Sequence, residues 1–200
     1  MNLLDYNRGI HPRCGSVFSF KNDILVTPFY TEEYCREIVS GCKLNPEAFF
    51  DTSQINDIYP NYILPLNRVS EIILQHYITQ FASKIIPTIN SLFLRPSITA
   101  IKIPFINRFT TSTQVSMELH CDVSTVSTFI KLNNDFEGGN LNFPRQEFKS
   151  QDVPVGFAII FPGTLTHPHC VEKLTAGERY TMISFATPPP WDSNGVINFN

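Results

Sequence analysis

The sequence has no long hydrophobic run and no excess of basic residues, and each absence excludes a class of protein. No segment of the 200 residues approaches the roughly 20 apolar residues of a membrane span, and the first 15 residues hold no apolar stretch typical of a signal peptide. The 15 Lys and Arg are scattered along a chain of net charge -3, unlike the basic patch of a nucleic-acid-binding protein. We therefore expect a soluble, cytoplasmic protein with neither a membrane nor a nucleic acid as partner.

Cysteine is also scarce. The chain has five cysteines, an odd number without a CxxC pair, so a disulfide framework or a zinc ribbon is not indicated. We expect reduced thiols at all of them: Cys14, Cys35, Cys42, Cys121 and Cys170.

The chain, with 200 residues of which 42% are hydrophobic, is long enough for one domain. Its two halves differ in their local sequence patterns. In the first half, a short strand leads through Pro28 to a helix with Thr31 as its N-cap, ending near Gly41. A second helix begins after Pro65, and Pro87 should kink or end it. The second half holds short β-like runs whose spacing predicts a sandwich or barrel: "SITAIKIPF", "STFIKLN", "GNLNFP", "GFAIIFP" and "RYTMISFA".

We predict a single domain in three parts. Residues 1–95 form a largely helical support, residues 96–188 form the β core, and residues 189–200 are a C-terminal extension. The "PPP" at 188–190 is expected to end the ordered fold, and Gly138-Gly139 in "DFEGGNLNF" to supply positive φ for a turn.

The stretch "LHCDVSTVS" at 119–127 places His120 and Asp122 two residues apart in a predicted strand, where both side chains would lie on one face. Fe(II) oxygenases bind their metal with two histidines and one carboxylate, so a third ligand is required. Of the other histidines, His11 and His76 are better explained as structural or solvated. The candidates that remain are in "PGTLTHPHC": His167 and His169.

Five stretches in this order resemble the catalytic domain of the procollagen lysyl hydroxylases, which are iron(II)- and 2-oxoglutarate-dependent dioxygenases. They are "HCDVST" (120–125), "LNNDFEGG" (132–139), "PGTLTHPH" (162–169), "GERY" (177–180) and "SFATP" (184–188). The resemblance covers about residues 75–188. It implies a mostly β fold, with a double-stranded β-helix (jelly-roll) core and flanking N-terminal α-helices.

The resemblance also implies a set of site residues. The metal ligands are His120, Asp122 and His169, and Arg179 binds the carboxylate of 2-oxoglutarate, a role suited to its planar guanidinium. Thr181 lies two residues further on the same strand face and is either a second donor to that carboxylate or an ordinary strand residue. For His167 we expect a role beside the site or in a lid. The implied cofactors are Fe(II), 2-oxoglutarate and O2, and ascorbate is considered with them.

The chain also departs from the family pattern. A family tyrosine before the iron motif is Phe109 here, and two family cysteines are Leu141 and Phe148, which fits a chain outside oxidising compartments. Glu118 replaces a basic residue, and its carboxylate either meets a substrate ammonium or is a surface acid.

Three hypotheses about function remain open. The favoured one is hydroxylation of lysine, peptidyl or free, coupled to decarboxylation of 2-oxoglutarate to succinate and CO2. The second is hydroxylation of proline or another small or peptidyl substrate by the same chemistry. The third is a non-catalytic relative that serves as a binding module. A homodimer is a further expectation.

Overall fold

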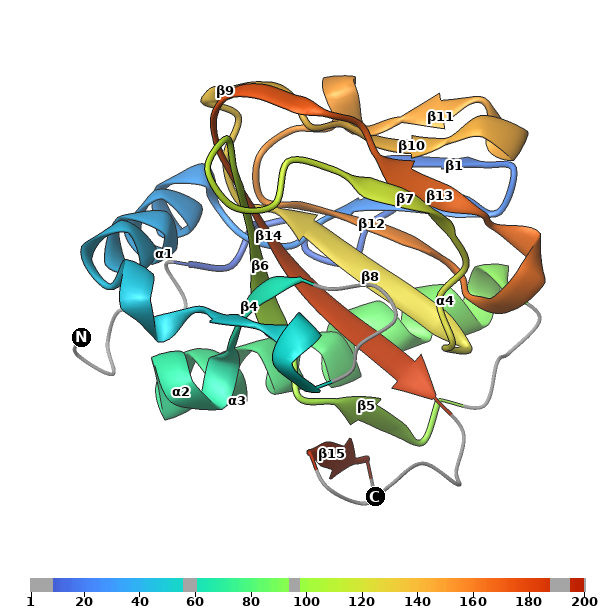
Figure 1. Ribbon diagram of the computed structural model, residues 1–200. Coiled ribbons are helices and arrows are strands. Elements are labelled where there is room, and N and C mark those ends of the chain that lie inside the picture. Colours follow the sequence, from blue (N-terminus) through green and yellow to red (C-terminus); the bar gives the residue numbers. More distant parts are fainter. Residues whose placement is uncertain (1–8, 56–60, 94–97, 188–194, 200) are drawn as a thin grey trace.

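Two β-sheets lie face to face at the centre of the structure, and helices cover the outer face of the larger sheet (Figure 1). The computed structural model describes residues 9–55, 61–93, 98–187 and 195–199. Within these residues the larger sheet has the order β1 (Ser19–Lys21), β2 (Ile24–Pro28), β12 (Phe157–Pro162), β8 (Val126–Lys131), β14 (Leu174–Thr187), β6 (Phe105–Thr110), β4 (Tyr62–Pro65) and β3 (Phe50–Asp51).

Three short strands extend the larger sheet. They pair with β14 or with one another: β5 (Ala100–Lys102), β9 (Phe136–Gly138) and β15 (Val196–Asn198). The smaller sheet has the order β11 (Phe148–Lys149), β10 (Leu141–Phe143), β13 (His169–Val171) and β7 (Met117–His120). The strands expected in the second half of the chain are therefore present, and the protein is mostly β.

The first helix, α1 (Glu32–Leu44), begins as predicted. The Thr31 side chain accepts a hydrogen bond from the Tyr34 N–H at 3.3 Å, which satisfies one of the free amides of the first turn. The helix does not end near Gly41 but runs to Leu44. Gly41 continues the helical conformation, and the Asn45 side chain donates to the Gly41 carbonyl at 2.9 Å, so the cap lies one turn later than expected.

The second helical segment comprises α2 (Leu66–Val69), α3 (Glu71–Gln80), a π-helical turn (Phe81–Ile85) and α4 (Ile86–Leu92). Pro87 does not end it, contrary to one of the two outcomes expected. The wider turn before the proline explains why, because the Ile86 N–H reaches back to the Phe81 carbonyl and the chain enters α4 without requiring a donor from Pro87.

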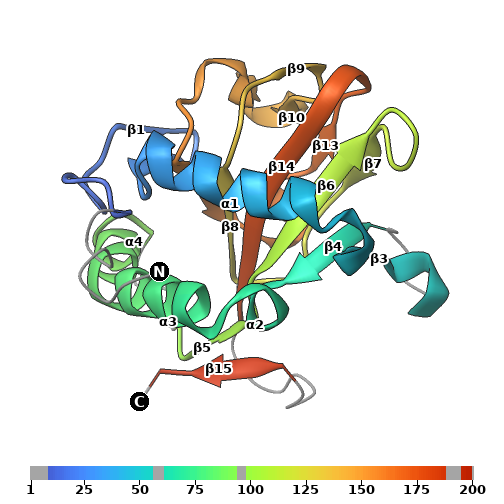
Figure 2. The same cartoon turned by 90° about the vertical axis from the view of Figure 1, so that its left-hand side faces the viewer.

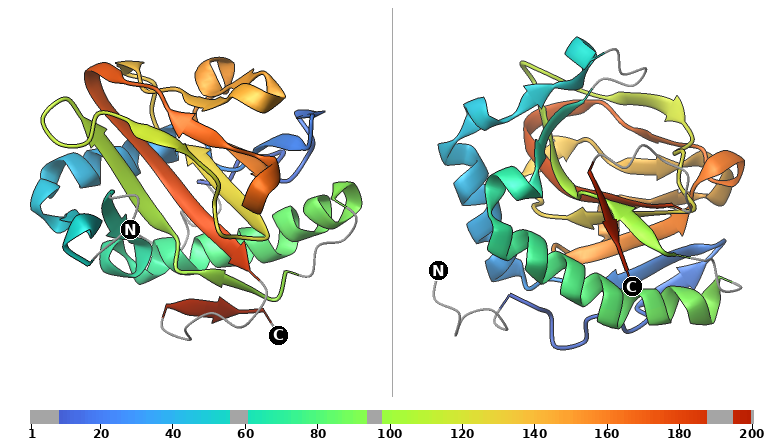
Figure 3. Two further views of the ribbon diagram at one scale, coloured as in Figure 1. Left: turned by 45° about the vertical axis from the view of Figure 1, so that its right-hand side comes forward. Right: turned by 90° about the horizontal axis from the view of Figure 1, so that it is seen from below.

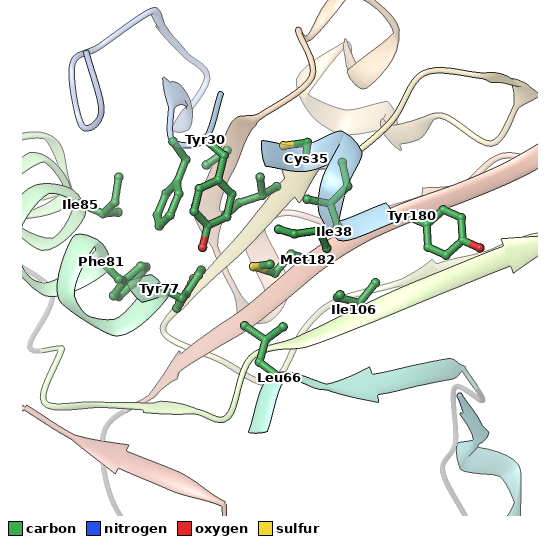
Figure 4. Close-up of a cluster of buried hydrophobic side chains, with 14 of the residues drawn as sticks. Tyr30, Cys35, Ile38, Leu66, Tyr77, Phe81, Ile85, Ile106, Tyr180 and Met182 are labelled. Atoms are coloured by element: carbon green, nitrogen blue, oxygen red, sulfur yellow. The ribbon is translucent and has the colours of Figure 1, made fainter. Parts of the chain in front are cut away.

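Two hydrophobic cores result from this layering. The first lies between the helices and the larger sheet, where Tyr77, Phe81 and Ile85 meet Tyr30 and Met182 (Figure 4). The second lies between the two sheets and is rich in phenylalanine; it includes Phe109, Phe129, Phe143 and Phe161. Figures 2 and 3 show α1 and the α3–α4 segment on the side of the larger sheet away from the smaller one.

Both ends of the chain contribute to the larger sheet. The segment 1–95 is not only helical support, because β1 to β4 come from it. The "PPP" at 188–190 lies outside the described residues, but the fold does not end there. Val196–Asn198 forms β15 beside β5, and Phe199 contacts the helix core.

All five cysteines are free thiols, as expected. Gly138 and Gly139 have φ of 70° and 60°, which confirms the positive φ expected at both. No helix in the described part of the chain is long and apolar enough to cross a membrane.

His76 gives a prediction about stability. It is buried in the helix core with Nδ1 at 3.3 Å from the Tyr34 hydroxyl, and burial lowers the pKa of His76 to about 4. Because the unfolded chain takes up a proton near pH 6.5 and the folded one does not, stability falls as pH falls from about 6.5 toward 4. Between pH 7.5 and 5, the titration of His76 should lower the free energy of unfolding by on the order of 2 kcal/mol. Urea unfolding of wild type and His76→Gln at both pH values checks this. The same change in unfolding free energy between the two pH values in both proteins would contradict it.

Candidate metal and co-substrate site

A cavity of about 430 Å³ opens between the two sheets. Its floor comes from alternate residues of two neighbouring strands: Phe105, Asn107 and Phe109 on β6, and Arg179, Ile183 and Phe185 on β14. The opposite wall comes from β7, β13 and the segment after β7. The period-two alternation of strands thus directs one face of β6 and β14 into the cavity, while the intervening residues Ile106 and Met182 enter the helix core.

His120, Asp122 and His169 meet in the wall of this cavity. Their ligand atoms all lie within 4.8 Å of one another. His120 at the end of β7 pairs directly with His169 at the start of β13, and the centroids of the two rings are 4.5 Å apart. Asp122 Oδ1 is 3.6 Å from the Nε2 of each imidazole. Two imidazoles and one carboxylate on one side of a shared centre are the donor set of the Fe(II) facial triad.

The hydrogen bonds of the two imidazoles fit metal binding. Nδ1 of His120 is 2.8 Å from the Glu118 carbonyl, and Nδ1 of His169 is 3.0 Å from the His167 carbonyl. A carbonyl only accepts, so each Nδ1 is the protonated nitrogen and each Nε2 presents a lone pair to the centre. Nε2 of His169 is buried without a hydrogen-bond partner among the described residues. An orphaned buried nitrogen is costly, and a metal ion at this point would satisfy it.

The pKa values of the two histidines are shifted in opposite directions. Burial lowers the pKa of His169, against the opposing effect of the Asp122 carboxylate. The pKa of His120 is raised instead, because its interactions with the Asp122 carboxylate and with the Glu118 carbonyl outweigh the effect of burial. A neutral imidazole is the form that binds a metal, so a cation at this site would compete with a proton on His120.

The local backbone around the two ligands from "LHCDV" is not a continuous strand. β7 ends at His120, and Asp122 lies in the connection to β8, so strand alternation does not explain why their side chains converge. The pairing of β7 with β13 is also irregular, because Met117 opposes Val171 while His120 opposes His169. Two residues of β7, Glu118 and Leu119, thus oppose the single residue Cys170 of β13, and Met117 and His120 both line the cavity.

This bulge affects Glu118, which was expected to share a face with His120. Glu118 is exposed, and it is not among the described residues that line the cavity. Its backbone carbonyl, rather than its carboxylate, contacts His120. A contact between the Glu118 side chain and a substrate stays a prediction.

His167 lies beside the site and faces away from it. Its Nε2 is 3.1 Å from the Asn22 carbonyl in the β1–β2 turn, and its Nδ1 is 2.9 Å from the Thr166 hydroxyl. Its backbone carbonyl orients His169. The geometry therefore places His169 with the other two candidate ligands and places His167 outside them.

Arg179 lines the cavity from β14 and is 5% exposed. Its guanidinium stacks over the Phe109 ring at 5.3 Å from the centroid. Burial lowers the pKa of Arg179 to about 10, so the group remains charged at neutral pH. No carboxylate among the described residues pairs with this cation. A buried cation without a protein counter-ion is suited to an anionic ligand.

Thr181 and Lys131 lie next to Arg179. Thr181 is buried on β14 opposite Lys131 of β8, and both line a small space that also includes Arg179. Lys131 Nζ donates to three backbone carbonyls, of Ser150, Gln151 and Val153, and is therefore committed to the protein. Whether Thr181 donates to a ligand stays a prediction.

Sequence reasoning did not find several polar residues of the cavity. Asn107 donates to the Asn61 side chain at 3.0 Å, and the Thr52 hydroxyl accepts from the Asn61 N–H at 2.8 Å. The alternation of Phe105, Asn107 and Phe109 in "FINRF" was the available signal for one cavity-facing strand. Thr52 and Asn61 come from the region of β3 and β4, where the sequence carries no comparable pattern.

Similar folds occur among solved structures of oxygenases. A prolyl-4-hydroxylase of Pseudomonas putida matches with a TM-score of 0.62 at 17% identity, over 84% of this chain and 94% of that one. A prolyl hydroxylase of Trichoplax adhaerens, in complex with a hypoxia inducible factor oxygen degradation domain peptide fragment, matches with a TM-score of 0.66 at 18% identity, over 83% of this chain and 84% of that one. The protein therefore has the fold of the 2-oxoglutarate–Fe(II) oxygenases.

In sequence, the chain is related to the procollagen lysyl hydroxylases. A multifunctional procollagen lysine hydroxylase and glycosyltransferase of Caenorhabditis elegans is 40% identical over 87 residues, 42% of this chain and 12% of that protein. Procollagen-lysine,2-oxoglutarate 5-dioxygenase 1 of Mus musculus is 27% identical over 180 residues, 83% of this chain and 24% of that protein. The chain thus spans less than a quarter of the length of these relatives. A search against protein-family models gives no match.

Proposed function

We propose that this protein is an Fe(II)- and 2-oxoglutarate-dependent hydroxylase that acts on lysine. The observation that carries the proposal is the combination, in one cavity, of the His120–Asp122–His169 donor set with the buried guanidinium of Arg179. The relatives in sequence and in fold are 2-oxoglutarate-dependent hydroxylases, which supports the same chemistry. A double-stranded β-helix core is part of this proposal and agrees with the two facing sheets.

The chain's residues would divide the work as follows. His120, Asp122 and His169 would hold Fe(II) through Nε2 and carboxylate atoms, and Arg179 would bind the distal carboxylate of 2-oxoglutarate. Bound Fe(II), with 2-oxoglutarate and O2, supplies an oxidant for an unactivated C–H bond, with succinate and CO2 as by-products. The aromatic residues Phe109, Phe129 and Phe185 line the cavity, so they exclude water from the reacting groups.

Lysine is favoured because the sequence relatives are lysine hydroxylases by name. Peptide-bound lysine is favoured over the free amino acid because large apolar side chains are exposed beside the candidate ligands. Leu119 precedes His120, Val123 follows Asp122, and Leu165 lies in the turn before His169; they are 58%, 76% and 85% exposed. We propose that these side chains contact the residues that flank a peptide-bound lysine, which the free amino acid lacks.

A second candidate, hydroxylation of proline or another uncharged residue, is supported by a specific observation. Of the described residues that line the cavity, only Asp122 carries a carboxylate, and Asp122 is committed to the metal. The walls are otherwise largely apolar, with Ile63, Ile103 and Phe105 among them. A cationic side chain would need a counter-ion that an uncharged ring does not need.

One experiment tests the proposal and separates the candidates. The protein would be incubated with Fe(II), 2-oxoglutarate and O2, with and without ascorbate, and with free lysine, free proline and peptides that contain each. Mass spectrometry would measure the gain of one oxygen atom, and succinate would be measured in parallel. We expect oxygen gain on a lysine-containing peptide. Gain on proline alone would favour the second candidate, and the absence of Fe(II) binding and succinate formation would contradict the oxygenase proposal.

A further inference from the structure

Two buried serines lie behind the candidate ligand Asp122. Ser127, on β8, is fully buried and donates from its hydroxyl to Asp122 Oδ2 at 2.5 Å. The Ser124 hydroxyl is 2.8 Å from that of Ser127. A hydroxyl has one proton, and that of Ser127 is committed to the carboxylate, so Ser124 is the donor in the second bond. The two hydroxyls form a chain directed at one oxygen of Asp122.

The two oxygens of Asp122 therefore have different partners. Oδ2 accepts from Ser127, whereas Oδ1 is the oxygen at 3.6 Å from both imidazole Nε2 atoms. We propose that Ser127 is a positioning residue that holds Asp122 as a one-oxygen ligand of the metal. This inference rests on the proposed function. With Oδ2 held by Ser127, Asp122 would offer one oxygen, Oδ1, to a bound metal and would leave the rest of the site to 2-oxoglutarate and O2.

Hydrogen bonds hold the backbone around Asp122, so the rotation of its carboxylate group is the freedom that remains. The hydrogen bond from Ser127 restricts that rotation. The Thr164 N–H donates to the Asp122 carbonyl at 2.6 Å, and the Gly163 N–H donates to the Thr125 carbonyl at 3.2 Å. A Cβ atom on Gly163 would lie 2.2 Å from the Ser124 carbonyl oxygen, so only glycine permits this approach. The final torsion of an aspartate side chain is broad and two-fold, so a fixed backbone does not select one oxygen for the metal.

Thr164 provides independent evidence that this turn is held tightly. Its φ is 62°, in the left-handed region that a β-branched residue rarely adopts. Such strain persists only where surrounding contacts determine the conformation, and it gathers at functional sites. The strained residue is the one whose N–H holds the Asp122 backbone.

The test measures binding of Mn²⁺ alone, by the loss of the EPR signal of the free ion. Loss of a hydrogen-bond partner behind a metal ligand weakens metal binding by about 10- to 100-fold, which is the loss expected for Ser127→Ala. Ser124→Ala keeps the bond from Ser127 and should cause a smaller loss. The matched control is Thr128→Val on the same strand, because the buried Thr128 hydroxyl has no hydrogen-bond partner among the described residues. Its affinity should equal that of wild type.

The outcomes separate the two proposals. Wild type that fails to bind Mn²⁺ overturns the proposed function, and this inference with it. Wild type that binds, with Ser127→Ala binding equally well, overturns the role of Ser127 alone. The thermal midpoint of each metal-free variant is measured alongside. If Ser127→Ala does not fold, Ser127→Cys decides, because a thiol fills a similar space but is a weak donor: affinity below that of Thr128→Val supports the role of Ser127, and equal affinity overturns it.

Discussion

Replacing His169 with alanine is expected to abolish Fe(II) binding and turnover, whereas His167→Ala should retain part of both. His169 presents an orphaned buried Nε2 toward Asp122 and His120, so its loss leaves two donors for the metal. His167 makes its side-chain contacts to Asn22 and Thr166 instead. Its carbonyl, which orients His169, survives the substitution. We therefore expect a nearly complete loss in the first variant and a partial loss in the second.

The measurement combines anaerobic Fe(II) titration with succinate formation. Alanine at position 169 also leaves a void beside Phe143 and Phe161. The centroids of these two rings lie 5.1 and 5.0 Å from the centroid of the His169 ring. His169→Gln fills more of this space and separates loss of the ligand from loss of packing. Equal and total loss in the His167 and His169 variants, with both folded, would contradict the assignment of His169 as the ligand.

Local sequence patterns predicted the elements of this fold better than their ends. The Thr31 cap and the strand runs of the second half are present because each depends on neighbouring residues. Gly41 was expected to lie near the end of its helix and Pro87 to end or kink the next one, yet both helices extend beyond these residues. Asn45 and the π-helical turn supply the compensation, and neither has a sequence signal that outweighs glycine or proline.

In the candidate site, too, the sequence indicated the residues but not the geometry that brings them together. The three residues expected as metal ligands from "LHCDV" and "PGTLTHPH" lie together in the structure, but the reason first given for the convergence of His120 and Asp122 was wrong. Asp122 lies beyond the end of β7, and its position depends on contacts with Ser127 and Thr164. Glu118 was placed by alternation, which the bulge in β7 breaks. Bulges and long-range hydrogen bonds are properties of the folded pairing, so a single sequence does not reveal them.

The burial of Arg179 leads to the second large expected effect. Its guanidinium is 5% exposed, stacks on Phe109 and pairs with no carboxylate among the described residues. If it binds the distal carboxylate of 2-oxoglutarate, Arg179→Ala removes a buried charge-assisted pair worth about 2 to 5 kcal/mol. The apparent affinity for 2-oxoglutarate should fall by tens- to thousands-fold. Arg179→Lys retains the charge but loses the two-pronged geometry, so its affinity for 2-oxoglutarate should lie between those of wild type and Arg179→Ala.

The design separates loss of the carboxylate contact from general damage to the cavity. Arg179→Met fills the space of the side-chain stem without charge and should lose affinity as Arg179→Ala does. Wild type and Arg179→Met would each be titrated with 2-oxoglutarate and with 2-oxobutanoate, which lacks the distal carboxylate, in the presence of Fe(II) and without O2. Wild type should prefer 2-oxoglutarate strongly, and the variant should lose that preference because the distal carboxylate is the group that Arg179 would recognise. A variant that keeps the full preference while binding Fe(II) normally would show that another residue holds the carboxylate.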